Sequence, residues 1–438
     1  MKKLGLAIGL LIAFVGIYYV TVGSKQVTRE IKKEVNREIT KLQSAGFTIE
    51  KQELQDNKEH LVLDFNNTEE IAKYLQTIDK DISKEDVAFL KGLKLGLDIE
   101  YNPNLENAVA CDIYPVRLPD IMYVDLEGKG NDVIKSIEDM MNKKEILAHI
   151  NINKFLSKFD GYVKDIDKQL KLKGVKFDGE IDGSKIKNLN NSLVELSFAV
   201  PNELKMELIN LKLFMTNPIA KGYDNHTEYS IDLLNVEGNE TIRIEGIKGS
   251  SDDIQKGKLL NSLGKLNITS INYKDKSENL LFKGIYGEMD IKNIDMETFL
   301  KLNSLLSQDK EGDDLFKEMI PLLKRIIASD IFIDVPSISI AKIVQNGKAI
   351  DGFNLKALLK LNKNFNLKSL ESEPLAITKL LNANVELEAS NELVALISSN
   401  PKAMVIMMIL QPIDKNGKKY YNIEFTNGTL KINGKALI

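Results

Sequence analysis

Short runs of alternating apolar and polar residues fill the middle of the chain, from about residue 146 to residue 286. In the runs 204–208, 229–233 and 241–245, apolar side chains occupy every second position, which is typical of strands with one buried face. Asp178-Gly179, Asp182-Gly183 and Glu237-Gly238-Asn239 are predicted turns between such runs. Because no long helical crossovers separate the runs, we expect an extended, curved, mostly antiparallel sheet.

Helical patterns flank this region. Residues 25–44 place an apolar residue at every third or fourth position, with Gly46 as the predicted C-cap. Further helices are expected at 68–78, 132–141 and 315–328. Two more are expected after predicted N-caps: one follows the capping pattern at Ser83, and the other, at 296–307, follows Asp295. The stretches 93–99, 121–126, 330–343, 353–361, 420–426 and 429–432 are predicted strands, with predicted turns at Asn346-Gly347 and Asn427-Gly428. The apolar residues 403–410 are predicted to be either a buried helix or a second membrane-seeking piece.

The first 24 residues contain an uncharged apolar run at positions 4–22, preceded by Lys2 and Lys3. At about 1.5 Å per residue, a helix of this length reaches roughly 28 Å, close to the thickness of one hydrocarbon core. The run is longer than most signal-peptide cores, which favours an uncleaved anchor, and the alternative is a secretory signal cut before Ser24. We expect a single span with the bulk of the chain translocated across the membrane.

Small residues at Gly5, Gly9 and Ala13 share one face of this predicted anchor helix. Spacings of four residues let two membrane helices approach closely, so a homodimer is a possible partner arrangement. The whole chain is mildly acidic, with a net charge of −4 and scattered lysines. This composition argues against a nucleic-acid partner.

No cofactor or metal site emerges from the motifs. Gly128-Lys129-Gly130 lacks the third glycine of a dinucleotide fingerprint, because position 133 is Val133. His149 lies in an apolar run and is predicted to be a satisfied or core residue, His226 is placed in a polar loop, and the single Cys111 is predicted to be a buried apolar residue. With no catalytic motif in the sequence, we expect no catalytic, cofactor-binding or metal-binding residues and no enzymatic activity.

The C-terminal part carries a resemblance. Residues 322–361 predict a helix, strand, turn and strand, and the chain closes with a Leu-x-x-Asn-Gly-x-x-Leu pattern at Leu430, Asn433, Gly434 and Leu437. This part resembles the YdgA-like family, a bacterial domain of unknown function with one N-terminal membrane helix and a large periplasmic part. The resemblance implies a protein of the bacterial inner membrane with its body in the periplasm, and it supplies no catalytic residues.

The expected fold class is therefore α+β, with a transmembrane helix followed by an elongated, mostly antiparallel β-rich body and helices packed on its sheets. The predicted segments are an anchor at 1–23, a membrane-proximal helix at 24–45, an α+β region at 46–145, an antiparallel β-rich region at 146–290 and an α+β region at 291–438.

Two functions remain open on the sequence. The first is a non-enzymatic structural or binding role in the cell envelope, with an envelope protein as a possible partner. The alternative is binding or transport of a lipid or other hydrophobic ligand along an apolar sheet groove, which is similar to the architecture of AsmA-like periplasmic proteins. The apolar residues of 93–99 and 204–215 are the predicted groove walls, and ordinary core packing is the other interpretation of the same residues.

Overall fold

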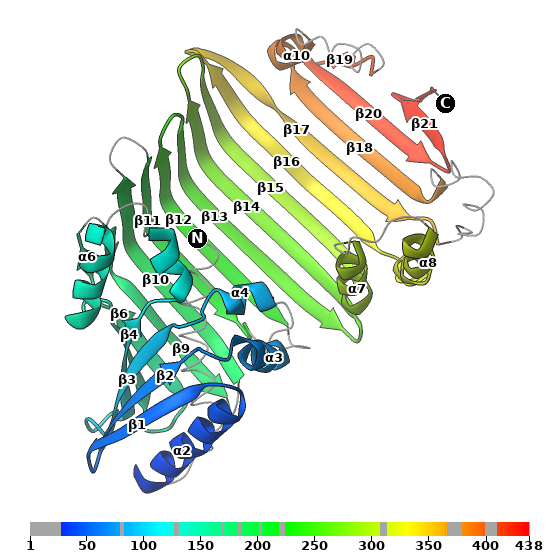
Figure 1. Cartoon of the computed structure of the whole chain (residues 1–438). Helices are drawn as coiled ribbons and strands as arrows, with labels where there is room; N and C mark the ends of the chain where they lie inside the picture. Colours follow the sequence, from blue (N-terminus) through cyan, green and yellow to red (C-terminus); the bar gives the residue numbers. More distant parts are fainter. Residues whose placement is uncertain are drawn as a thin grey trace. The chain divides into compact units, whose positions relative to one another are not determined.

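A computed structural model describes residues 28–78, 83–126, 131–168, 170–182, 185–200, 204–218, 224–306, 313–363, 365, 379–398 and 410–437. These residues are mostly antiparallel strand, which confirms the β-rich body, with helices between some of the strands (Figure 1). The contacts divide the chain into two compact units. Unit 1 comprises residues 1–198 with 212–220, and unit 2 comprises 199–211 with 221–438. The five predicted segments stay a prediction.

Unit 1 is an antiparallel meander in which each strand pairs with the next. Its neighbours run β1–β2–β3–β4–β5–β6–β9–β10, while β8 pairs with both β7 and β10. The strands are β1 (Thr48–Gln55), β2 (Lys58–Asp64), β3 (Lys94–Tyr101), β4 (Asn107–Arg117), β5 (Ala148–Asn153), β6 (Lys158–Val163), β7 (Ile166–Asp167), β8 (Leu170–Lys173), β9 (Val175–Asp182) and β10 (Lys185–Val200).

Helices make the connections at one end of this meander only. α3 (Thr68–Ile78) and α4 (Lys84–Ala88) join β2 to β3, and α5 (Asp120–Leu126) and α6 (Asn131–Asn142) join β4 to β5. At the opposite end β1–β2, β3–β4 and β5–β6 are joined by short turns. α2 (Thr28–Ser44) leads into β1 at the helical end, where Thr48 lies opposite Asp64, the last residue of β2.

The core of unit 1 lies between α2, α3 and the sheet. Val35 and Ile39 from α2 and Ile71 from α3 are buried against residues of β2 and β3, including Leu95 and Ile99. The alternation in 93–99 thus reflects core packing, which confirms that interpretation of the stretch and not the interpretation as a groove wall. Burying large aliphatic side chains on both elements contributes roughly 1.5–3 kcal/mol for each one fully removed from water.

Unit 2 is also an antiparallel meander, with longer strands. β12 to β18 each pair with the next strand in antiparallel register, and β20 pairs with β18, β19 and β21. The strands are β11 (Leu204–Thr216), which the unit boundary divides, β12 (Asn225–Glu237), β13 (Thr241–Lys256), β14 (Leu259–Lys274), β15 (Asn279–Asp295), β16 (Phe332–Gln345), β17 (Lys348–Leu361), β18 (Leu381–Ser390), β19 (Ile413–Lys415), β20 (Lys418–Thr426), β21 (Thr429–Ile432) and β22 (Lys435–Ala436). α7 (Met296–Leu306) and α8 (Asp313–Ala328) join β15 to β16, and α10 (Asn391–Ser398) follows β18.

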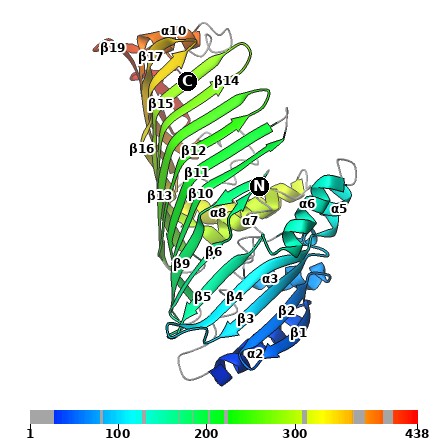
Figure 2. The same cartoon turned by 90° about the vertical axis from the view of Figure 1, so that its left-hand side faces the viewer.

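Two glycines interrupt these long strands without breaking their pairing. Gly246 in β13 has φ 64° and Gly284 in β15 has φ 62°, left-handed values that side chains disfavour. They lie opposite Thr269 and Ala341 in registers that stay continuous on both sides. Figure 2 shows the unit 2 strands bent along their length, with α7 and α8 on one side of them.

Most predicted helices are confirmed, with their caps. Gly46 ends α2 with φ 96°, Ser83 accepts a hydrogen bond from the backbone N–H of Asp86, and Asp295 accepts one from that of Thr298. Asn346-Gly347 and Asn427-Gly428 both have positive φ and form the predicted turns.

Two local predictions are wrong. The expected strand at 121–126 is α5, which follows Pro119, because a short apolar run does not by itself distinguish a strand from a helix. The expected turn at Asp178-Gly179 lies inside β9: a Cβ on Gly179 would come within 2.6 Å of the Phe159 ring, so this glycine serves packing.

The predicted anchor, Gly128-Lys129-Gly130 and residues 403–409 of the apolar stretch fall outside the described residues. Within the residues that are described, no helix combines the length and apolarity needed to cross a membrane.

Candidate functional site

A row of apolar side chains crosses seven neighbouring strands of unit 2. Each residue of the row is the direct cross-strand partner of the next, from β12 to β18: Ile231, Ile247, Ile268, Ile285, Ile340, Phe353 and Ala389. Partners opposite one another in a sheet project from the same face, so the row contains no polar side chain on that face. At about 4.8 Å between strands, six intervals extend it over roughly 29 Å.

Parallel rows repeat this pattern. Two residues along, Leu266, Gly287, Ile338, Leu355, Leu387 and Tyr421 are successive partners, and further along Ile291, Ile333, Leu359, Ala383, Phe425 and Leu430 are successive partners. We call the residues of these rows the apolar face. Between the rows, the opposite face carries polar partners such as Asn267, Tyr286, Ser339, Asn354 and Glu388.

The apolar face extends past the glycine bends. On the far side of Gly246 and Gly284 another row consists of Leu234, Ile244, Ile271, Phe282, Ile343 and Ile350. Phe282 and Ile343 pack in one cluster with Ile340 and Phe353 from the near side, so both rows occupy one face. The apolar positions lie three residues apart across each bend instead of two. At these glycines the alternation of apolar and polar positions is therefore shifted by one residue, so the apolar side chains on both sides of the glycine lie on the same face.

Little of this face is covered. α10 packs Leu393 and Val394 over one corner, where Ile343, Ile350 and Ala389 are buried. Tyr421 is also fully buried, whereas most other side chains of the face are only partly buried and Ile338 is 43% exposed. Met289, which lies between Gly287 and Ile291 in β15, is 45% exposed. From the row spacing, the first three rows alone span roughly 600 Å², at the upper limit of apolar patches on soluble monomers.

The chemistry of the apolar face is simple. Its side chains are aliphatic or aromatic, and the backbone groups of the interior strands are already paired within the sheet. Such a surface offers area to a hydrophobic ligand and few hydrogen bonds to a polar one.

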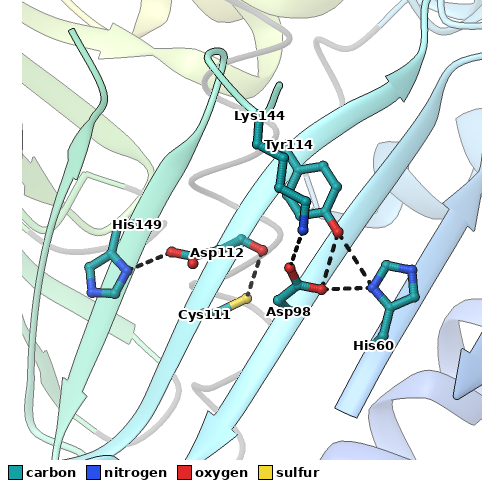
Figure 3. A network of polar contacts seen from close by, with 7 residues as sticks. All are labelled: His60, Asp98, Cys111, Asp112, Tyr114, Lys144 and His149. Atoms are coloured by element: carbon teal, nitrogen blue, oxygen red, sulfur yellow. Dashed lines mark hydrogen bonds and ion pairs between the residues drawn. The ribbon is translucent and has the colours of Figure 1, made fainter. Parts of the chain in front are cut away.

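Unit 1 carries a polar network on its sheet (Figure 3). His60 in β2 donates from Nδ1 to Asp98 Oδ1 at 2.7 Å, Tyr114 in β4 donates its hydroxyl to the same oxygen at 3.1 Å, and Lys144 donates to Asp98 Oδ2 at 2.6 Å. The Lys144 ammonium also lies 3.9 Å from the centre of the Tyr114 ring. Gly96 makes room for that ring, because a Cβ there would be 2.5 Å from Tyr114 Cε2.

The charges in this network stabilise one another. Burial raises the pKa of Asp98, but the hydrogen bonds from Lys144 and His60 outweigh it and the net pKa is lowered. Burial likewise opposes the charge of Lys144, whose hydrogen bond to Asp98 nevertheless raises its pKa. Burial is the main cause of the raised pKa of Tyr114. Lysine and aspartate therefore stay charged at neutral pH, and the tyrosine stays protonated.

All three histidines of the chain have the same environment. His60 lies directly opposite Asp98, His149 opposite Asp112 and His226 opposite Asp252, with Nδ1 to Oδ1 distances of 2.7, 2.6 and 2.6 Å. The hydrogen bonds to their carboxylates raise the pKa of His149 and of His226. These pairs connect adjacent strands.

These pairs resemble the base and orienting acid of a catalytic triad. Cys111, next to Asp112, is not placed as an accessible nucleophile, because it is buried in the core with its pKa raised by burial, and its Sγ donates to the backbone oxygen of Asp112 at 3.9 Å. Among the residues that the structure describes, no three His, Cys, Asp or Glu side chains are grouped to hold a metal ion. The arrangement supports cross-strand ion pairing.

The sequence located some of these residues and missed others. Cys111 is buried and His149 is satisfied, as predicted. The prediction of a polar loop at His226 is wrong, since it lies in β12 opposite Asp252. Of the predicted groove walls, 204–215 lies in β11, where most side chains are half-buried. The apolar face of β12 to β18 was not predicted, although Gly246, Gly284 and Gly352 each have an apolar residue two positions before and one position after them, a pattern that signals it.

Comparisons with known proteins were made for the whole chain. They found no match. Neither a family model, nor a curated protein, nor a solved structure is similar to this sequence.

Proposed function

We propose that this chain binds the acyl chains of membrane lipids on the apolar face of unit 2. The observation that carries the proposal is the row from Ile231 to Ala389, seven directly opposed apolar residues with no second layer over most of them. An exposed apolar patch of this size carries an unfavourable free energy in water unless a ligand covers it.

Acyl chains suit this face better than a peptide does. A peptide that binds a sheet by strand addition needs a free edge, and the apolar face is formed by interior strands with paired backbones. An acyl chain needs no hydrogen bonds and gains from contact area alone. Half of a hydrocarbon core, the depth of one leaflet, is about 15 Å, so a face some 29 Å wide has room for more than one chain.

The proposed setting is the bacterial inner membrane. The apolar run at 4–22 is the proposed anchor, with the body in the periplasm as the resemblance to the YdgA-like family implies. The proposed role is non-enzymatic. It is a binding or transfer surface, and the cross-strand His–Asp pairs connect adjacent strands within each unit.

Adjacent residues of β17 provide a matched test. Leu355 lies on the apolar face and Lys356 on the opposite face. The photoreactive residue p-benzoylphenylalanine is placed at either position of the full-length chain, cells expressing it are irradiated, and lipid adducts are identified by mass spectrometry.

We expect a lipid adduct at position 355 and none at position 356. Equal lipid adducts at both positions, or none at 355, would overturn the proposal. An adduct of position 355 with a protein would also overturn it, in favour of a protein partner.

A further inference from the structure

The short turns at one end of unit 1 expose large apolar side chains. Leu54 near the β1–β2 turn is 53% exposed, Leu105 in the β3–β4 loop is 90% exposed, and Phe155 in the β5–β6 turn is 81% exposed. In an antiparallel meander these three connections lie at the same end of the sheet. We call these three residues the apolar tips. The opposite end has the helical connections α3–α4 and α5–α6.

Two of the tips are held by asparagine side chains within their own loops. Asn104 Oδ1 accepts hydrogen bonds from the backbone N–H of Glu106 at 2.9 Å and of Asn107 at 2.8 Å. Asn153 Oδ1 accepts from the backbone N–H of Ser157 at 2.9 Å and of Lys158 at 3.1 Å. Such side-chain turns order a loop locally, so Leu105 and Phe155 are presented to solvent by ordered loops. Ordered loops that keep large apolar residues in water indicate a surface that something apolar covers.

The start of α2 lies at this same end. Lys32, in the second turn of α2, donates to the backbone oxygen of Asp56 in the β1–β2 turn at 3.1 Å, and it lies 3.5 Å from Glu53. The predicted anchor ends at residue 22 and the described helix begins at Thr28. The five residues between them span at most about 18 Å when fully extended. If the run at 4–22 is membrane-embedded, the start of α2 is therefore within roughly 20 Å of the end of that run, and it lies at the same end of unit 1 as the apolar tips.

We propose that the apolar tips insert into the membrane interface and orient unit 1 on the bilayer. Three large side chains on one end give the interface a second contact beside the anchor. Lys154, next to Phe155 in the sequence, places an ammonium group near the lipid phosphates. Side chains of this kind reach about 5–10 Å into the boundary between headgroups and acyl chains. This contact involves neither the apolar face of unit 2 nor its ligand.

Site-specific fluorescence tests the insertion in the full-length chain. Phe155→Cys and Leu105→Cys are labelled with an environment-sensitive dye and reconstituted into vesicles of phosphatidylethanolamine and phosphatidylglycerol, with and without bromine on the acyl chains. Lys143→Cys is the matched control, because Lys143 is exposed and follows α6 at the opposite end of the sheet. The unsubstituted chain measures any labelling of the buried Cys111.

We expect brominated lipid to cause a loss of emission from dye at 155 and at 105, and no loss from dye at 143. If brominated lipid leaves the emission of dye at 155 and at 105 unchanged, the proposal is overturned. Equal quenching at all three positions would overturn it too, because it would show that no end of unit 1 is selected. If the chain does not float with the vesicles, it is not membrane-bound and the proposal is overturned. The lipid adducts at position 355 test the proposed function separately.

Discussion

Replacing Gly352 with alanine should weaken the pairing of β16 with β17. A Cβ at this position would lie 1.9 Å from the backbone oxygen of Ile340, and no side-chain rotation can relieve that contact. The substitution must displace the strand itself. The neighbouring pairs Ile340 with Phe353 and Lys342 with Asp351 would separate first.

The magnitude follows from what is displaced. Two lost backbone hydrogen bonds cost about 0.5–1.5 kcal/mol each, and looser packing around Phe353 and Ile350 adds to this, giving roughly 2–4 kcal/mol in all. For a unit of about 230 residues, each kcal/mol corresponds to a fall of about 2–4 °C in melting temperature. We therefore expect Gly352→Ala to melt roughly 4–16 °C below the parent chain.

Gly287 supplies the control. It lies in β15 on the apolar face, and a Cβ there meets no atom within 4 Å. Alanine at this position should be neutral or stabilising by about 0.5–1 kcal/mol, since glycine in a strand carries an entropic cost. The two variants are compared with the parent by differential scanning calorimetry of the full chain. If Gly352→Ala has the same melting temperature as Gly287→Ala, the steric reasoning is wrong.

Two further predictions concern unit 1. Because the hydrogen bond to Asp112 raises the pKa of His149, its contribution to stability is fully present below about pH 6.5 and is lost as the pH rises through the folded-state pKa. The melting-temperature difference between the parent and His149→Gln should shrink as the pH rises, and a difference that grows would contradict the pairing. Burial of Cys111, which raises its pKa, should keep its thiol unreactive with maleimide until the chain is unfolded in guanidinium. Fast modification of the native chain, at the rate of the exposed Phe155→Cys thiol, would count against the described core.

Local chemistry predicted the caps and several turns correctly. Ser83, Asp295 and Gly46 act through hydrogen bonds or backbone angles within a few residues of themselves. The same holds for Asn427-Gly428, whose positive φ values match the turn that closes β20 on β21. Such features need no information from distant segments, so sequence patterns find them.

Predictions failed where distant segments decide the outcome. Asp178-Gly179 has the composition of a turn, yet in the folded chain Gly179 allows the approach of the Phe159 ring from the neighbouring strand β6. Leu95 and Ile99 alternate like the apolar face of unit 2, but α2 and α3 cover them. Alternation indicates that one face is apolar, and it does not say whether another layer covers that face.

The sequence alone determined that the chain is β-rich and antiparallel, where many of its helices begin, and that its first residues include an uncharged apolar run, whose role as a membrane anchor stays a prediction. Only the tertiary structure decided that the isoleucines of β12 to β16 align in one row, because register depends on hydrogen bonds between residues tens of positions apart. It also decided which apolar face is covered. Coverage depends on where α2, α3 and α10 pack, and Leu54, Leu105 and Phe155 share one end of unit 1 only because the strands between them form a meander.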